Sequence, residues 1–233
     1  MLTKPTSFRI RSYVPRGRRT EAQERAYQKL WPVFGLELTD KPINLPKVFG
    51  NDAPSFLEIG FGSGQSLLSV AQLQPENNFI GVETHQPGIG ALLMGIEKNQ
   101  VKNLRVYYND VIDVLNQCIA PESFAGIQIF FPDPWQKRRH SERRLIQPEF
   151  INLAISRIKK GGILHLATDW EDYAVHMMRV VSAETRLTNI AGAGRFANER
   201  SAKRPVQTKF ELRALREGRK IWEIQLISIA DFS

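Results

Sequence analysis

The alternation of apolar and polar positions divides the middle of the chain into short strands separated by helices. Short apolar runs end at glycine, proline or acidic residues, and stretches with helical periodicity lie between them. The expected strands are Ser55–Ile59, Phe79–Glu83, Leu104–Tyr108, Gly126–Phe131, Gly161–Asp169, Arg186–Ala191 and Ile221–Ile229. The expected helices cover about 65–72, 88–99, a segment starting near 110, 148–159 and 173–182. This order predicts an α/β fold with a parallel sheet covered on both faces.

The two ends of the chain lack this regular alternation. Residues 1–50 contain five prolines and little periodicity before Ala22–Leu30, so we expect a basic N-terminal extension, partly disordered. A single domain is expected at 51–233, because 233 residues with 42% hydrophobic content suit one sizeable core. Between the last two strands lies a stretch too long for a hairpin turn, which we expect to be a functional or mobile loop.

The distribution of charge along the chain indicates a binding partner. The net charge is +8, but segments 4–29, 136–144 and 195–220 carry +6, +4 and +6, so the rest of the chain carries −8. Three basic segments on an acidic body predict a polyanionic partner whose phosphates release counterions on binding.

Other composition features exclude classes of protein. The apolar runs are too short to span a bilayer, and the N-terminus lacks the apolar block of a secretory signal. The single cysteine, Cys118, excludes an internal disulfide, and four scattered histidines argue against structural zinc. We therefore expect a cytoplasmic protein with no membrane segment and no metal.

A glycine-rich turn, LEIGFGSGQS, follows the first strand and opens a helix. Gly60, Gly62 and Gly64 would let a ligand approach bare backbone at the helix N-terminus. Their G-x-G-x-G spacing departs from the G-x-G-x-x-G that binds a dinucleotide pyrophosphate. Glu58, just before the turn, would repel a pyrophosphate but suits a cofactor with a cationic amino group.

Two further carboxylates stand at the carboxyl ends of the next two strands, Glu83 as the last residue of the second strand and Asp110 just after the third. Glu83 is placed to accept both hydroxyls of a ribose, and Asp110 to receive an adenine amine. Each alone is explained equally well by a salt bridge or a helix cap. Together with Glu58 they predict a crevice for a positively charged adenosine derivative, S-adenosyl-L-methionine.

The segment FFPDPWQKRRH, residues 130–140, follows the fourth strand. Pro132 and Pro134 restrict the backbone around Asp133 and hold its carboxylate in place. Trp135 and Phe131 offer flat faces for a base, although a place in the core explains each as well and is favoured for Phe131, and Lys137 onward suits phosphate. Beside a methyl donor, this arrangement suggests methylation of a nucleobase.

The motifs FFPDPWQKRRHSERR, LEIGFGSG, GVETHQPG, LHLATDWEDYA and RPVQTKFE resemble the bacterial tRNA (guanine-N7)-methyltransferase family. The resemblance runs from about Arg11 to Trp222, and the FPDPW and T-K-F-E segments are its specific parts. It implies a class I S-adenosylmethionine-dependent methyltransferase fold, Rossmann-like, with a seven-stranded mostly parallel sheet and helices on both faces. It also implies methylation of N7 of guanine 46 in the variable loop of tRNA.

The resemblance assigns roles to residues, with Asp133 both catalytic and in contact with the cofactor. The cofactor site it implies consists of Glu58, Gly60, Gly62, Gly64, Glu83, Asp110 and Asp133. The substrate site consists of Lys137, Asp169, Thr208, Lys209, Phe210 and Glu211. The RNA-contacting loop consists of Arg138, Arg139, His140, Arg143 and Arg144.

Guanine N7 carries a lone pair and no proton, so Asp133 is expected to position the base and stabilise charge, without acting as a base at N7.

Three alternatives stay open. D-P-W loosely resembles the D-P-P-Y turn of enzymes that methylate exocyclic base amines. A nicotinamide-dependent oxidoreductase is disfavoured by the glycine spacing and Glu58. A non-catalytic RNA-binding protein on the same fold is disfavoured by the intact acidic crevice. The chain is expected to act as a monomer or homodimer.

Overall fold

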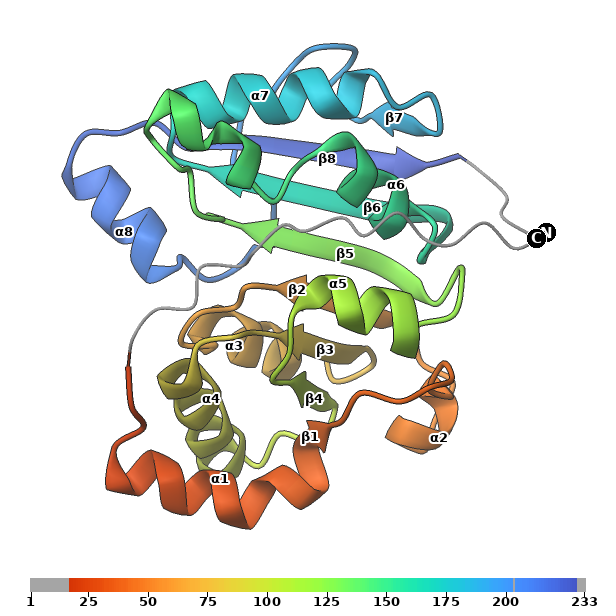
Figure 1. The fold of residues 1–233 in the computed structure, drawn as a ribbon, viewed down its shortest axis with the longest axis vertical. Helices are drawn as coiled ribbons and strands as arrows, with labels where there is room; N and C mark the ends of the chain where they lie inside the picture. Colours follow the sequence, from red (N-terminus) through yellow and green to blue (C-terminus); the bar gives the residue numbers. More distant parts are fainter. Residues whose placement is uncertain (1–16, 203, 230–233) are drawn as a thin grey trace.

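The computed structural model describes residues 17–202 and 204–229, and its centre is one twisted sheet (Figure 1). In these residues the sheet has eight strands in the order β1-β4-β3-β2-β5-β6-β8-β7. The strands are β1 (Gly35–Leu36), β2 (Ser55–Ile59), β3 (Asn78–Val82), β4 (Leu104–Tyr107), β5 (Phe124–Phe130), β6 (Ile158–Thr168), β7 (Leu187–Asn189) and β8 (Trp222–Ser228). Strand β8 runs antiparallel to β6 and β7 on its two sides, and the other described strand pairs are parallel. The expected mostly parallel sheet is confirmed, with the two-residue β1 added at one edge.

The helices cover both faces of this sheet. They are α1 (Glu21–Phe34), α2 (Leu45–Phe49), α3 (Gln65–Leu73), α4 (Gln86–Asn99), α5 (Val111–Asp113), α6 (Pro148–Ile155), α7 (Glu171–Ser182) and α8 (Lys209–Arg216), with a π-helical turn η1 (Val114–Cys118) and a 3₁₀ turn η2 (Arg138–Arg143). The core falls into two apolar clusters. One contains buried residues of α1, α3 and α4, and the other contains those of α5, α6 and α7. Strands β2 and β3 are buried almost throughout, as expected for central parallel strands.

The strand order reverses between β2 and β5, and this reversal positions the site. From β2 the chain adds β3 and β4 on one side, and from β5 it adds β6 on the other. Loops that leave the carboxyl ends of β2 and β5 therefore diverge and open a crevice between them. The glycine turn follows β2 and the Asp133 turn follows β5, so both expected ligand-binding segments meet at this crevice.

The expected N-terminal extension is, in its described part, integrated with the domain. Helix α1 begins with a capping box between Thr20 and Gln23, and its buried Ala26 and Leu30 join the apolar cluster that contains α4. Strand β1 pairs in parallel with β4. Residues 1–16 lie outside the described residues, so the expectation of disorder there stays a prediction.

One expected helix end is wrong, and one expected loop contains a helix that was not predicted. The helix expected to reach residue 159 ends at Ile155, because Ile158 already pairs with Phe124 and β6 begins there. The expected loop between the last two strands contains α8, which lies beyond the carboxyl ends of β5 and β6 (Figure 1). No helix in the described part of the chain is long and apolar enough to cross a membrane.

Candidate functional site

The glycine turn after β2 has a backbone that other residues adopt only with strain. Gly60, Gly62 and Gly64 have φ of 72°, 60° and 73°. A side chain on Gly64 would also meet Leu92 of α4 at 2.8 Å, so this glycine allows α3 to start against α4. Gly60 faces open space, and the nearest atom to a side chain on Gly62 would be Phe210 at 3.9 Å. Gly60 and Gly62 therefore leave room for a ligand, while Gly64 is required for packing.

Glu83, directly after β3, closes over the glycine turn. Its Oε2 accepts the backbone N–H of Gly62 at 2.7 Å. Its Oε1 accepts the N–H groups of Thr84 at 2.7 Å and His85 at 3.0 Å. A carboxylate oxygen accepts two hydrogen bonds, so Oε2 retains capacity for one ligand hydroxyl. Glu83 is therefore held rigidly at the position expected for a ribose contact.

Glu58 lies beneath the same turn and is only 5% exposed. Its Oε2 is buried without a hydrogen-bond partner among the described residues. Burial raises the pKa of this carboxyl to about 8, and the positive charge of Arg204 opposes the rise. With this pKa the carboxyl carries its proton near neutral pH in the free protein, and a cationic ligand beside it would favour the ionised form, as expected for an adenosine derivative with a sulfonium and an amino group.

The Asp133 turn is strained on both sides of the carboxylate. Phe131 has φ of 53° and Trp135 has φ of 45°, a left-handed conformation that costs about 1–3 kcal/mol per residue. Pro132 and Pro134 fix the backbone between them. Asp133 remains accessible to solvent, and the partial burial of its carboxyl raises its pKa. Such strain persists only where the surroundings enforce one conformation, so the turn holds Asp133 in a defined place.

These segments enclose a pocket of about 290 Å³. Its walls combine two carboxylates, bare backbone and three aromatic rings. The lining residues are Ile59, Gly60, Gly62, Val82, Glu83, Thr84, His85, Asn109, Val111, Phe131, Pro132, Asp133, Trp135, Arg143, Leu145 and Phe210. Phe131, expected in the core, thus contributes to the pocket together with Trp135.

Asp110 has the helix-capping role that the sequence left open. Its Oδ1 accepts the N–H of Ile112 at 2.8 Å at the start of α5. The neighbouring Asn109 and Val111 line the pocket at this point. The capping role orders the β4–α5 connection, and with it this wall of the pocket.

The T-K-F-E residues are distributed over three environments. Thr208 caps α8 through its Oγ1, which accepts the N–H of Glu211 at 3.1 Å. Lys209 is exposed, and Phe210 lines the pocket. Glu211 is 1% exposed and pairs with Arg200 and Arg204 behind the pocket wall. The motif therefore builds a capped helix that presents one aromatic ring to the site.

The basic loop after Asp133 divides in a similar way. Arg143 lies over the Trp135 ring at 5.2 Å, and His140 contacts the ring edge-on. Lys137 and Arg139 are exposed. The side chain of Arg138 lies outside the described residues.

Arg144, expected to contact RNA, is 3% exposed. Its Nε donates to the carbonyl of Pro134 at 2.9 Å, and it pairs with Asp172. Arg144 thus supports the Asp133 turn from behind.

Asp169 lies in a neighbouring groove of about 670 Å³. Its carboxylate pairs with Arg219 at 2.8 Å, and Trp170 and Trp222 line the same groove. The described structure thus brings Asp133, Glu83 and Phe210 to one pocket and places Asp169 beside a second one.

Sequence reasoning missed two contributions to the site. Thr84, His85 and Asn109 line the pocket, and their position directly after strands β3 and β4 is a signal that could have found them. Arg204 was missed as well. It is fully buried, and its place at the start of the RPVQTKFE motif is the signal that could have found it.

The sequence resembles known methyltransferases. Residues 52–224 match a protein family described as "Putative methyltransferase". A relative from Idiomarina loihiensis named tRNA (guanine-N(7)-)-methyltransferase is 49% identical over 217 residues, which are 93% of this chain and 88% of that protein. A relative of the same name from Pseudomonas entomophila is 49% identical over 218 residues, covering 93% and 90% of the two chains.

Solved structures share the fold at low sequence identity. The 16S rRNA methyltransferase KamB superposes with a TM-score of 0.58 at 14% identity, covering 83% of this chain and 95% of that one. The Haemonchus contortus phosphoethanolamine N-methyltransferase 2, solved in complex with S-adenosyl-L-methionine, gives 0.50 at 11% identity, covering 89% and 57%. These likenesses establish the fold, with the crevice described above at its strand-order reversal.

Proposed function

This chain belongs to the tRNA (guanine-N7)-methyltransferase family, and from this premise we propose that it methylates N7 of guanine 46 in the variable loop of tRNA, using S-adenosyl-L-methionine. The observation that carries the proposal is the pocket between the glycine turn and the Asp133 turn. One half of this pocket is formed by glycine backbone and a carboxylate, and the other half is formed by aromatic rings beside a basic loop.

The cofactor half is formed by Gly60, Gly62 and Glu83, and the buried Glu58, just before the glycine turn, does not line the pocket itself. The spare acceptor capacity of Glu83 suits a ribose hydroxyl, and Glu58 beneath the turn favours a cationic ligand. When bound, S-adenosyl-L-methionine supplies an electrophilic methyl group attached to a sulfonium. Asp110 acts on this half indirectly, by capping α5 and fixing Asn109 and Val111.

The base half is formed by Phe131, Asp133, Trp135 and Phe210. The rings of Trp135 and Phe210 offer apolar faces for a purine, and Asp133 lines the same pocket. Guanine N7 attacks with its own lone pair, so no residue has to remove a proton there. The carboxylate of Asp133 instead aligns the base and stabilises the positive charge that the purine acquires on methylation.

The basic segments bind phosphates of the RNA backbone, and only some of their cationic side chains are exposed enough to do so. Lys137, Arg139, His140 and Arg143 lie in and beside η2, Arg143 also lines the pocket, and these side chains suit phosphates of the variable loop; we include Arg138 with them. In an A-form helix N7 faces a deep, narrow groove that side chains cannot enter. The target guanine therefore has to come from an irregular region of the tRNA.

The proposal is tested with an unmodified tRNA transcript and a matched transcript in which guanine 46 is replaced by adenine. Incubation with S-adenosyl-L-methionine should make the first transcript, and not the second, cleavable by aniline at nucleotide 46, because N7-methylation labilises that position. Mass spectrometry of the nucleosides should give 7-methylguanosine. A methyl group on an exocyclic amine, or cleavage at another nucleotide, would reject the proposal.

A further inference from the structure

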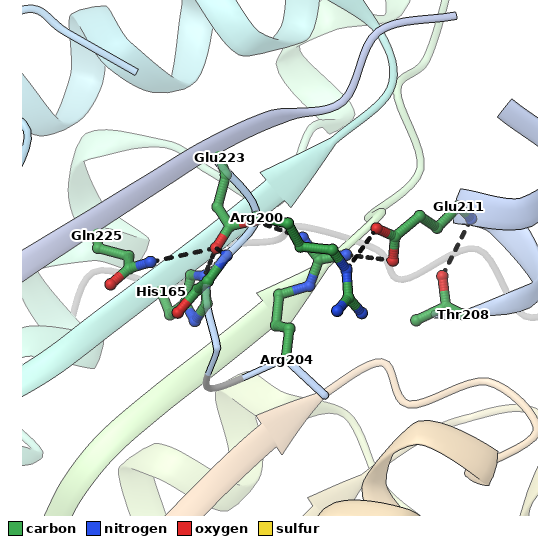
Figure 2. Close-up of polar contacts among 8 residues, drawn as sticks. His165, Arg200, Arg204, Thr208, Glu211, Glu223 and Gln225 are labelled. Atoms are coloured by element: carbon green, nitrogen blue, oxygen red, sulfur yellow. Dashed lines mark hydrogen bonds and ion pairs between the residues drawn. The ribbon is translucent and has the colours of Figure 1, made fainter. Parts of the chain in front are cut away.

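A buried arginine lies behind the two sides of the pocket that would meet the base. Arg204 is 1% exposed, in the segment that leads to α8. Its Nη1 donates to Oε2 of Glu223 at 2.7 Å, and its Nη2 donates to Glu211 (Figure 2). The planar guanidinium thus bridges two carboxylates that come from different elements, which the single ammonium of a lysine cannot do in the same geometry.

One carboxylate anchors Arg204 to the sheet. Glu223 lies in β8 and also accepts Nε2 of His165, in β6, at 2.6 Å and the N–H of Ser201 at 3.1 Å. Burial opposes ionisation of Glu223, but the hydrogen bond from His165 and the charges of His165 and Arg204 hold its pKa at about 2. Glu223 is therefore a fixed negative charge at the end of the sheet.

The other carboxylate anchors Arg204 to α8. Glu211 also accepts Nε of Arg200 at 2.8 Å. Helix α8 spans eight residues, of which Glu211 and Ala214 are buried. A helix of this length is not stable in isolation, and this one has little apolar contact with the body. Its position, and that of Phe210 on it, therefore depends strongly on the ion pair between Arg204 and Glu211.

The face of the same guanidinium touches the start of the Asp133 turn. Its carbon lies 4.9 Å from the ring centre of Phe130 and 5.5 Å from that of Phe131. Phe131 carries the left-handed backbone that begins the strained turn. Arg204 therefore supports Phe131 from behind on one side and α8 on the other, and both Phe131 and Phe210 face the pocket.

Stability alone is a weak reason for this arrangement. Removing an arginine and two carboxylates from water costs several kcal/mol per ion, and apolar side chains of similar volume are often as stable or more so. What a network of this kind contributes is a fixed geometry between the elements that it connects.

We propose that Arg204 is a positioning residue for methyl transfer: by bridging Glu223 and Glu211 under Phe131, it sets the spacing between Asp133 and Phe210 on either side of the target base. The proposal rests on the proposed function for its catalytic consequence. It makes a structural claim as well, that α8 is held in place by this arginine.

The experiment compares wild type, Arg204→Lys and the control Arg186→Lys. Lysine keeps the charge near Glu58 and the carboxylates but loses the two-way bridge. Arg186, next to β7, forms a two-pronged pair with the single carboxylate of Glu184, through its Nε at 2.7 Å and Nη2 at 2.5 Å, and bridges no second carboxylate in the described contacts. Glu223→Gln provides a second variant that weakens the anchor without touching the pocket.

Hydrogen exchange and kinetics are then measured on the full-length proteins. In Arg204→Lys, the amides of 208–217 should exchange about 10-fold faster or more, while those of α7 keep their wild-type rates. The kcat for tRNA methylation should fall by about 10- to 100-fold with the cofactor Kd within about threefold of wild type. Glu223→Gln should show the same pattern more weakly, and Arg186→Lys should match wild type in both measurements.

Wild-type exchange in 208–217 in Arg204→Lys and Glu223→Gln would overturn the proposal, whatever the activity. So would faster exchange with unchanged kcat, or a loss of kcat that follows only a loss of cofactor binding. If Arg204→Lys does not fold, Glu223→Gln decides by the same criteria. Absence of methylation by wild type would instead reject the proposed function, and the exchange result would still test the structural claim.

Discussion

Asp133 combines a rigid backbone with a partly buried carboxyl in the lining of the pocket. If it stabilises positive charge on the base, Asp133→Asn should lower kcat by about 10²–10³-fold, the usual cost of removing one preorganised electrostatic group. The Kd for tRNA should stay near wild type, because the phosphate contacts are unchanged. Single-turnover kinetics and filter binding measure the two quantities. The control Asp113→Asn changes an exposed carboxylate in α5 and should leave both unchanged. Wild-type turnover by Asp133→Asn would contradict the role.

The same carboxylate predicts a pH dependence. Burial raises the pKa of Asp133, and the charged form is the active one. Wild-type kcat should therefore be retained above this raised pKa and lost as pH falls through it, at higher pH than an ordinary aspartate would show. The remaining activity of Asp133→Asn should lack this acid limb. A pH–kcat profile of both proteins checks it, and identical acid limbs would count against the assignment.

Glu58 predicts how stability changes with pH in the cofactor-free protein. Its folded pKa of about 8 lies above the ordinary value of 4.5, so the folded state binds the extra proton between these pH values. Stability from this group is present below the ordinary pKa and is lost as pH rises toward 8, by an amount of the order of 3–5 kcal/mol. In urea unfolding, the free energy of unfolding of Glu58→Gln should rise relative to that of wild type as pH increases across this window. The difference between wild type and Glu76→Gln, a change at an exposed residue, should stay constant. Parallel curves for Glu58→Gln would refute the buried, unpaired state.

At the level of elements, the turn after β2 depends on a glycine for packing. Gly64→Ala forces a left-handed backbone and a contact with Leu92 at 2.8 Å, so it should destabilise the fold by about 2–4 kcal/mol. Gly161→Ala is the matched control. Its φ of 78° is similar but its surroundings are open, so it should cost only about 1–2 kcal/mol. Chemical denaturation measures both, and equal losses would show that α3–α4 packing does not require the glycine.

The elements that were predicted correctly from the sequence are those whose apolar residues face the core. Strands such as β2 and β3 are nearly uniform in burial, and their expected positions are confirmed. Helix α8 was missed because its apolar residues are out of phase with its buried face: Phe210, Leu212 and Leu215 are exposed, while Glu211 is buried. The positions of Glu83 and Asp133 after strands followed from the strand pattern. The burial of Arg144 and Arg204 did not, because it depends on ion pairs between segments distant in sequence.

At the level of the whole molecule, the net charge of the basic segments overstates the number of cationic side chains that can bind RNA. In the segment 195–220, Arg200 and Arg204 pair with Glu211, Arg213 pairs with Glu217, and Arg219 pairs with Asp169. The exposed cations near the pocket, including Lys137 and Arg139, are the ones expected to displace counterions from phosphate.

The affinities for tRNA and for S-adenosyl-L-methionine should therefore respond differently to salt concentration. Affinity for tRNA should fall by about 10-fold or more between roughly 50 and 200 mM salt, while affinity for S-adenosyl-L-methionine should hardly change. Arg139→Gln should reduce the slope of log K against log salt for tRNA by about one. Binding assays at constant pH give both slopes, and equal slopes for the two ligands would contradict the electrostatic grip.

The most direct test of the central claim is calorimetric titration of folded, RNA-free protein with S-adenosyl-L-methionine. The pocket at the reversal of strand order predicts saturable binding at one site per chain, weakened by about 10-fold or more in Glu83→Gln, since hydrogen bonds to that carboxylate are charge-assisted. Folded protein that produces no heat of binding with this donor would contradict the account.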